Sequence, residues 1–286
     1  MPNQKINYVF IGSSNFSTAV LSELQKNNFL PSLIITTKGK AKGRGLLVQE
    51  NIVKIWADKN GVPVIIPEKF NSEETEKILT KYDLALVASF GKIIGEKILS
   101  APKMGTLNIH PSLLPKYRGA SPLQSQILAD EKNIGVTIIR LDKEMDHGPI
   151  IAEETAILDT WPVSEDCLSK VLAVQGARLF VNTLPKWQNR EIKETEQSHN
   201  EATFTKKSEK SDGELDIING DPYKNYLKFL AFSTWPGTYF FVEKDNKKIR
   251  VLIKDAQYQN QQFIIKTVVP EGKKEMSYDA FRRGLK

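Results

Sequence analysis

The first 188 residues alternate between short apolar runs and stretches with the apolar spacing of a helix, and this alternation restricts the fold more than any other feature. The run at 83–89 has the unbroken apolar character of a strand that is buried on both faces. Other strand-like runs lie at 6–11, 33–37, 62–66 and 105–109. The pattern predicts an α/β fold, a doubly wound and mostly parallel sheet with helices on both faces.

The composition changes after this region. Residues 189–205 are polar and lack a clear period, which is typical of a linker. Residues 206–286 contain a helix start at Asp221-Pro222 and then short strand-like runs joined by turns, which indicate a small β-barrel. We therefore predict a domain at 1–188, a linker at 189–205 and a second domain at 206–286.

The positive charge is concentrated in the second predicted domain. The chain has a formal net charge of +6, and residues 206–286 carry 16 Lys and Arg against 11 Asp and Glu. The rest of the chain has 24 against 23. A small basic β-rich module suggests binding to a polyanion such as nucleic acid, although a solvated surface with Lys chosen for solubility explains the charge about as well.

Several classes of protein are disfavoured. No apolar stretch approaches the ~20 residues that span a bilayer, and the start of the chain lacks the pattern of a signal peptide. With a single cysteine, Cys167, these features lead us to expect a soluble, cytoplasmic protein. The loop after the first strand lacks the glycines of a dinucleotide fingerprint, and no phosphate-binding GxxxxGK[ST] loop occurs, so another cofactor is expected.

Asn108 and His110 are the first candidates for catalysis. They are two residues apart at the end of a predicted strand, so they face the same side. An amide donor and an imidazole that converge on one atom can stabilise the charge that develops on a carbonyl oxygen in acyl transfer. Either residue alone is more simply read as a satisfied loop residue.

Asp146 follows another strand-like run, 135–140, and precedes His147-Gly148. It could accept a proton from an attacking amine or orient His110, and an ordinary turn Asp beside a glycine remains an equal alternative. The three histidines and Cys167 show no metal-ligand spacing, so we expect no metal ion.

The arrangement Asn-x-His-x-Ser-Leu-Leu-Pro at 108–115, followed by Asp-His-Gly at 146–148, resembles the signature of methionyl-tRNA formyltransferases and, more broadly, of enzymes that use 10-formyltetrahydrofolate. The resemblance implies a Rossmann-like catalytic domain and an OB-like C-terminal barrel. It also implies that Asn108, His110 and Asp146 are catalytic. The residues that it implies for the folate site are Ser112, Leu113, Leu114, Pro115, Ala88, Phe90, Gly91 and Ile94.

Three features bear on the amine that accepts the formyl group. Residues 118–124 resemble the loop of the tRNA and amino-sugar branches. This resemblance makes glycinamide ribonucleotide a less favoured acceptor. Residues 229–237 resemble the helix-to-barrel entry of the tRNA enzymes. A glycine-rich loop at 37–46 resembles the loop that these enzymes lay against the acceptor stem, and its implied tRNA-binding residues are Lys38, Lys40, Lys42 and Arg44.

The resemblance thus implies transfer of formyl from 10-formyltetrahydrofolate to methionyl initiator tRNA, by a protein that we expect to be a monomer without membrane contact. Two alternatives stay open, namely a formyltransferase that acts on an amino sugar nucleotide and a non-catalytic RNA-binding protein. The first loop, Gly12-Ser-Ser-Asn-Phe16, departs from the family's usual Thr-Pro-Asp-Phe pattern, which leaves the placement of the amine open.

Overall fold

The computed structural model describes residues 6–42, 47–244 and 246–285. Contacts divide the chain into two compact units that interleave in sequence. The first unit comprises Met1–Gly119, Asn133–Ile157 and Ser169–Phe204, and the second comprises Ala120–Lys132, Leu158–Leu168 and Thr205–Lys286. The boundaries expected at 1–188, 189–205 and 206–286 are linear segments of the chain, and they stay a prediction.

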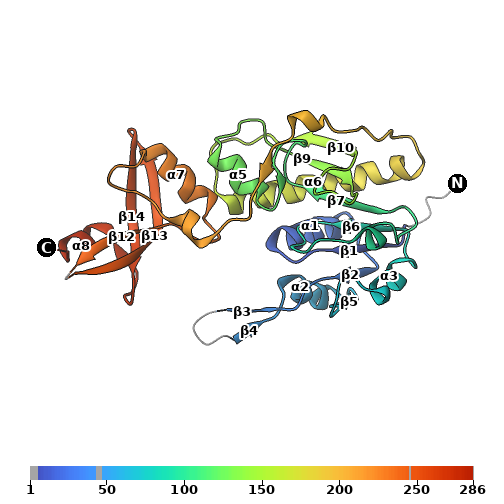
Figure 1. The fold of residues 1–286 in the computed structure, drawn as a ribbon, viewed down its shortest axis with the longest axis horizontal. Helices are drawn as coiled ribbons and strands as arrows, with labels where there is room; N and C mark the ends of the chain where they lie inside the picture. Colours follow the sequence, from blue (N-terminus) through green and yellow to red (C-terminus); the bar gives the residue numbers. More distant parts are fainter. Residues whose placement is uncertain (1–5, 43–46, 245, 286) are drawn as a thin grey trace. The chain divides into compact units, whose positions relative to one another are not determined.

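A seven-stranded sheet with the order β10-β9-β7-β6-β1-β2-β5 forms the centre of the first unit (Figure 1). Neighbouring strands from β7 to β5 run parallel, whereas β9 and β10 add antiparallel pairs at one edge. The predicted mostly parallel α/β sheet is therefore confirmed. Its strands are β1 (Tyr8–Ile11), β2 (Leu33–Ile35), β5 (Val64–Ile65), β6 (Leu84–Val87), β7 (Thr106–His110), β9 (Gly135–Arg140) and β10 (Ile150–Thr155).

The helices of this unit begin where polar side chains cap them. The side chains of Ser14, Asn51 and Ser72 accept hydrogen bonds from the first turns of α1, α2 and α3. The bounds are α1 (Asn15–Lys26), α2 (Ile52–Asn60), α3 (Glu73–Leu79) and α4 (Glu96–Leu99), and the long α6 (Glu165–Gln188) begins in the second unit and continues in the first.

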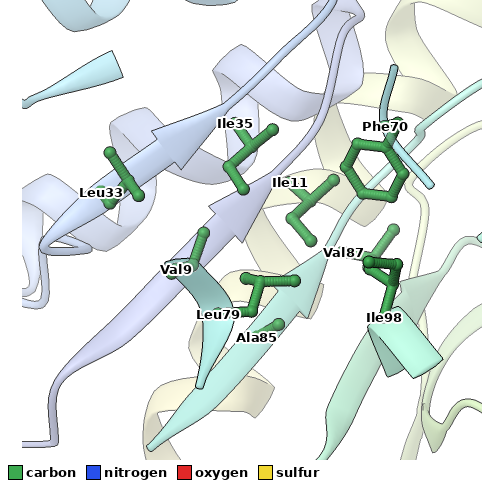
Figure 2. Packing of buried hydrophobic residues seen from close by; sticks show 9 residues of the cluster. All are labelled: Val9, Ile11, Leu33, Ile35, Phe70, Leu79, Ala85, Val87 and Ile98. Atoms are coloured by element: carbon green, nitrogen blue, oxygen red, sulfur yellow. The ribbon is translucent and has the colours of Figure 1, made fainter. Parts of the chain in front are cut away.

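Alternate residues of the central strands build a core on each face of the sheet. Figure 2 shows one of them, in which Val9 and Ile11 of β1 pack with Phe70 and with residues of α3 and α4. On the other face, Tyr8 contacts Phe180 of α6, with ring centroids 5.9 Å apart. Helices thus cover both faces of the sheet.

The loops that follow β1 and β6 are tied together. The Ser17 hydroxyl donates to the carbonyl oxygen of Ala88 at 2.6 Å and accepts from the backbone N–H of Ser13 and Ser14. A Cβ at Gly12 would overlap both the Ser17 side chain and the Ala88 carbonyl, so this approach requires glycine. The unusual first loop therefore has a fixed course against the loop after β6.

Four short described strands before residue 206 lie outside the large sheet, as does a 3-10 turn. β3 (Lys40–Lys42) and β4 (Leu47–Gln49) pair as an antiparallel ribbon. β8 (Arg118–Gly119) pairs with β11 (Phe204–Thr205), and η1 (His199–Glu201) precedes β11. Of the basic loop predicted to bind tRNA, Arg44 and the side chains of Lys40 and Lys42 lie outside the described residues, whereas Lys38 is exposed.

The second unit contains a four-stranded antiparallel sheet in the order β12-β13-β14-β15, as predicted for a β-rich C-terminal module. Phe240, Val251 and Val268 belong to the core on one face of the sheet. The strands are β12 (Tyr239–Lys244), β13 (Lys247–Gln259), β14 (Gln262–Pro270) and β15 (Met276–Ser277). The helical segments are α5 (Pro122–Leu128), η2 (Lys210–Gly213), α7 (Pro222–Ala231) and α8 (Tyr278–Arg283).

Within the described parts of the chain, no helix combines the length and the apolar character that crossing a bilayer requires.

The ion pair between Glu23 of α1 and Arg178 of α6 predicts a pH-dependent stability. Arg178 Nε donates to Glu23 Oε1 at 2.7 Å, and this hydrogen bond, opposed by burial and supported by Lys26, lowers the pKa of Glu23 from its usual 4.5. The pKa of Glu23 in the folded state lies below its value in the unfolded state. The pair therefore stabilises the fold at pH values above the unfolded pKa, and this contribution is lost as the pH falls through the folded pKa.

Arg178→Met is expected to lower the free energy of unfolding near neutral pH by about 1 kcal/mol, since the exposed arginine is screened by solvent. The difference from wild type should shrink in acid, where Glu23 is protonated in both proteins. Urea unfolding at neutral and at acidic pH measures this, and Lys186→Met on the same helix serves as the control. A deficit that is equal at both pH values would show that the pair is not its source.

Candidate active site

Asn108 and His110 lie on β7, a strand that is paired on both sides. Asn108 is opposite Val87 of β6 and Ile139 of β9, so its backbone is fixed in the middle of the sheet. Both polar side chains are nearly inaccessible to solvent, with 8% and 3% of their surfaces exposed. Buried polar groups of this kind need hydrogen-bond partners, and these come from two loops.

Asp146 supplies the first partner. Asn108 Nδ2 donates to Asp146 Oδ1 at 3.4 Å, and His110 Nδ1 lies 3.6 Å from the same oxygen. The structure therefore brings together the three residues that were predicted to be catalytic. An amide nitrogen, an imidazole nitrogen and a carboxylate oxygen surround one small volume.

The second partner fixes the tautomer of His110. Nε2 of this ring is 3.0 Å from the carbonyl oxygen of Tyr117. Because a carbonyl oxygen can only accept, Nε2 carries the proton, and Nδ1 is the ring atom that faces Asp146.

The loop that carries Asp146 reaches the trio by an unexpected path. β9 runs antiparallel to β7, so Arg140 is opposite Leu107, and Leu141 N–H donates to the Thr106 carbonyl. The loop thus starts near the amino-terminal end of β7 and comes back to Asn108. The expectation that Asp146 follows a strand is correct, but this strand end points away from the carboxyl ends of the parallel strands.

The position of Asp146 requires a tight backbone. Asp146 has φ +50, in the left-handed region that Asp tolerates better than most residues, and its Oδ2 accepts from Gly119 N–H at 2.8 Å. A Cβ at Gly148 would overlap the carbonyl oxygen of Arg140. Asp146 is therefore held by its own side chain and by the close approach that Gly148 allows.

The loop after β7, which was predicted to line the folate site, is held by hydrogen bonds from the neighbouring strand β9. Thr137 Oγ1 donates to the Ser112 carbonyl at 2.7 Å and accepts from Leu114 N–H at 3.1 Å. Ser112 and Leu114 are buried, and the Ser112 hydroxyl donates to the Lys116 carbonyl. Leu113 and Pro115 are half-buried. The side chains of Ser112 and Leu114 thus shape the loop.

The loop after β6 combines buried anchors with exposed apolar groups. Phe90 packs against Phe70 with ring centroids 4.6 Å apart, and Ile94 joins the same core cluster. Ala88 is fully buried, whereas Gly91 is exposed.

Two large exposed apolar side chains that the sequence reasoning did not single out lie in the loops that carry predicted site residues. Ile93, in the loop after β6, is 81% exposed, and Met145, next to Asp146, is 58% exposed. The sequence alone does not separate Ile93 from Phe90 and Ile94 of the same loop, which are apolar because they pack in the core.

A cavity of about 270 Å³ lies at the carboxyl ends of β1, β2, β5 and β6. It brings together one residue predicted for folate, Gly91, and one predicted for tRNA, Lys38, but none of the trio. Its charged lining residues are Lys38, Lys92 and Glu68, and its remaining lining residues are Ser13, Thr37, Pro67 and Gly91.

Among residues 6–42, 47–244 and 246–285, no group of three or more His, Cys, Asp or Glu side chains is arranged to hold a metal ion.

The fold and the trio define an α/β enzyme suited to acyl transfer, and similar proteins specify this class. A family model described as formyl transferase matches residues 4–184. A curated relative, methionyl-tRNA formyltransferase of Thermotoga sp. (strain RQ2), is 38% identical over 84% of this chain and 77% of its own length. The relative of the same name from Rickettsia typhi is 31% identical over 96% of both chains.

A solved structure, methionyl-tRNA formyltransferase from Clostridium thermocellum, matches with a TM-score of 0.62 at 17% identity and covers 93% of this chain and 98% of its own. At that identity it supports the fold. The chain belongs to the formyl transferase family and, within it, to the methionyl-tRNA formyltransferases. It is accordingly a transferase, as the resemblance in its sequence implies.

Proposed function

We propose that this protein transfers a formyl group from 10-formyltetrahydrofolate to the amino group of methionyl initiator tRNA. The observation that carries the chemical part is the convergence of Asn108, His110 and Asp146 on one volume, with distances of 3.4 and 3.6 Å to Asp146 Oδ1. The membership in the methionyl-tRNA branch supports the acceptor.

Each member of the trio has a role that follows from its atoms. The folate supplies the formyl carbon, whose bond to the folate nitrogen breaks as the bond to the acceptor amine forms. Asn108 Nδ2, and His110 Nδ1 once the ring carries a second proton, would donate to the carbonyl oxygen as it gains charge, which is worth several kcal/mol in a site that excludes water. Asp146 would take the proton that the amine releases and return it to the folate nitrogen as the bond from that nitrogen to the formyl carbon breaks.

The fit of the folate rests on the loop after β6. A pterin needs a flat apolar contact and an edge of backbone donors and acceptors. The exposed Ile93 and Met145 offer apolar surface, and the exposed backbone at Gly91 offers hydrogen-bonding groups. The predicted folate residues Ala88, Phe90 and Ile94 would hold this loop in place from the core.

The cavity beside that loop suits the charged end of the acceptor. Lys38 and Lys92 offer positive charge to a phosphodiester of the acceptor arm. Lys38 also begins the basic loop, and we propose that this loop, with Lys40, Lys42 and Arg44, neutralises phosphates of the acceptor arm.

Cations lie over aromatic rings on the face of the second unit's sheet that lies opposite the Phe240 core; Lys248 is exposed there, whereas Tyr239 is buried. Arg250 stacks on Tyr239 at 3.7 Å from the ring centroid, and Lys248 lies 4.1 Å from the centroid of Phe241. The strands alternate, so these side chains point away from the core that contains Phe240. We propose that this surface, the aromatic-cation stripe, contacts the tRNA.

The remaining expectations follow from this function. The partners would be the folate and the initiator tRNA, and the protein would act in the cytoplasm, where initiator tRNA is used. Catalysis without a metal and a monomeric state stay predictions.

The acceptor is tested by formyl transfer from 10-formyltetrahydrofolate to initiator methionyl-tRNA, with elongator methionyl-tRNA and an amino sugar nucleotide assayed in parallel. We expect transfer to the initiator alone. Transfer confined to the sugar would replace the acceptor but keep the trio. Absence of transfer to all three, with retained tRNA binding, would favour a non-catalytic RNA-binding protein.

Asp146→Asn is expected to lower kcat by about 100-fold or more, because the amide cannot take the amine proton. The fold should be retained, since the Asn oxygen can still accept from Gly119 N–H. Steady-state kinetics and a thermal melt measure both quantities. Asp159→Asn, the same change at an exposed position, is the control. Unchanged turnover in Asp146→Asn would exclude Asp146 from proton transfer.

Lys248→Ala is expected to raise KM for the charged tRNA about fivefold, as for one exposed ion pair of about 1 kcal/mol, and to leave KM for the folate unchanged. The slope of the logarithm of the tRNA binding constant against the logarithm of the salt concentration should fall in magnitude by about one. Lys224→Ala on α7, in the same unit, is the control. An unchanged KM and slope would remove the aromatic-cation stripe from the tRNA interface.

A further inference from the structure

Asp146 is held by its main chain as well as by its carboxylate. Gln197 Nε2 donates to the carbonyl oxygen of Asp146 at 2.9 Å and to that of Gly148 at 2.7 Å. One side-chain amide thus joins the backbone on both sides of His147. This amide spans the tight turn in which Asp146 has its left-handed backbone conformation.

The orientation of Gln197 is fixed by Arg118. Gln197 Oε1 accepts from Arg118 Nε at 3.1 Å and from Nη2 at 2.6 Å. Because a guanidinium can only donate, the amide oxygen must face Arg118, and the NH₂ group must face the two carbonyl oxygens. Both side chains are buried, with 4% and 3% of their surfaces exposed, so water does not compete for these bonds.

A stacked pair of imidazoles extends the assembly. Arg118 Nη2 lies 2.9 Å from His199 Nδ1, which therefore accepts. The His199 ring stacks on His147, with centroids 4.0 Å apart and an interplanar angle of 2°. His147 Nδ1 in turn contacts Asp142 Oδ2 at 2.7 Å. The segment at 197–199 is thus fastened to the loop at 142–148 by hydrogen bonds and by ring stacking.

Arg118 also connects this assembly to the carboxylate. The next residue, Gly119, donates its N–H to Asp146 Oδ2. A shift of β8 would therefore move both the donor to the Asp146 side chain and the group that orients Gln197. The main chain and the side chain of Asp146 are positioned by the same short strand.

We propose that Gln197, oriented by Arg118 and His199, is a positioning residue that holds Asp146 in its reactive geometry and so sets the turnover number of formyl transfer. The proposal rests on the proposed role of Asp146. It assigns a kinetic function to the segment at 189–205, which the sequence predicts to be only a linker.

Gln197→Glu is the sharpest variant. The change is nearly isosteric and keeps an oxygen for Arg118, but it places a second oxygen against the carbonyl groups of Asp146 and Gly148. We expect kcat to fall about tenfold or more, because small displacements of a reacting group cost this much, whereas both KM values stay within about twofold. Gln188→Glu, the same change at an exposed position of α6, is the control.

A double-mutant cycle with Asp146→Asn identifies the route of the effect. If Gln197 acts through Asp146, Gln197→Glu should lower kcat little or not at all once Asp146 is Asn. An equal loss in both backgrounds would overturn the proposal. If Asp146→Asn lowers kcat but Gln197→Glu does not, the positioning proposal is overturned while the proposed function stays intact.

His199→Ala removes an acceptor and a stacking partner at an exposed position, so it is expected to fold even where Gln197→Glu does not. It should lower kcat in the same direction by a smaller factor, again with both KM values unchanged. Unchanged turnover would remove His199 from the assembly.

Amide hydrogen exchange of the full chain tests the positioning without an activity assay. Peptides that cover 142–148 should exchange faster in Gln197→Glu than in wild type, and those that cover α3 should not change. Unaltered exchange at 142–148 would overturn the proposal even if the acceptor of the formyl group proves to be different.

Discussion

Two polar side chains on a strand inside the sheet, Asn108 and His110, have to be satisfied by groups that the sheet does not supply. Leaving a buried polar group without a partner costs about 1–3 kcal/mol. The loops around β7 meet this requirement, since Asp146 and the Tyr117 carbonyl come within 3.6 Å of the two side chains. The same contacts bring an amide, an imidazole and a carboxylate together. The hydrogen bonds that the buried side chains need for folding therefore also assemble the site.

This requirement explains why the site can be rigid although loops build it. Thr137, on the strand next to β7, pins the loop at 112–115 through two hydrogen bonds. Ser17, at the start of α1, ties the loop after β1 to the one after β6. The loops after β1, β6 and β7 therefore have anchors in the sheet or in a helix that packs on the sheet.

The sequence predicts the parallel part of the sheet well, because the apolar runs and the helical spacing are local properties. It also predicts the pairing of Asn108 with His110, since alternation along one strand decides it. The antiparallel direction of β9 is not readable in this way, because a strand-like run carries no sign of its partner's direction. The return of the loop to Asp146 could therefore not be placed.

Gln197 was missed for a related reason. A polar segment without a period is typical of a linker, and nothing local distinguishes a glutamine in solvent from one that bridges two carbonyl groups. The interleaving of 120–132 and 158–168 with the C-terminal residues has the same origin, because it depends on contacts between segments far apart in the chain.

The two surfaces proposed for tRNA differ in what they can recognise. The cavity next to the loop after β6 carries both signs of charge, with Lys38 and Lys92 beside Glu68, so it can distinguish one bound group from another by charge. The aromatic-cation stripe of the second unit places Lys248 and Arg250 over aromatic rings, which favours a phosphate backbone regardless of sequence. Selection of the amine therefore falls to the first unit, whereas the stripe contributes affinity that depends on salt. A sugar nucleotide would use the first surface and leave the second without a role, so the stripe is the structural feature that separates the two acceptors.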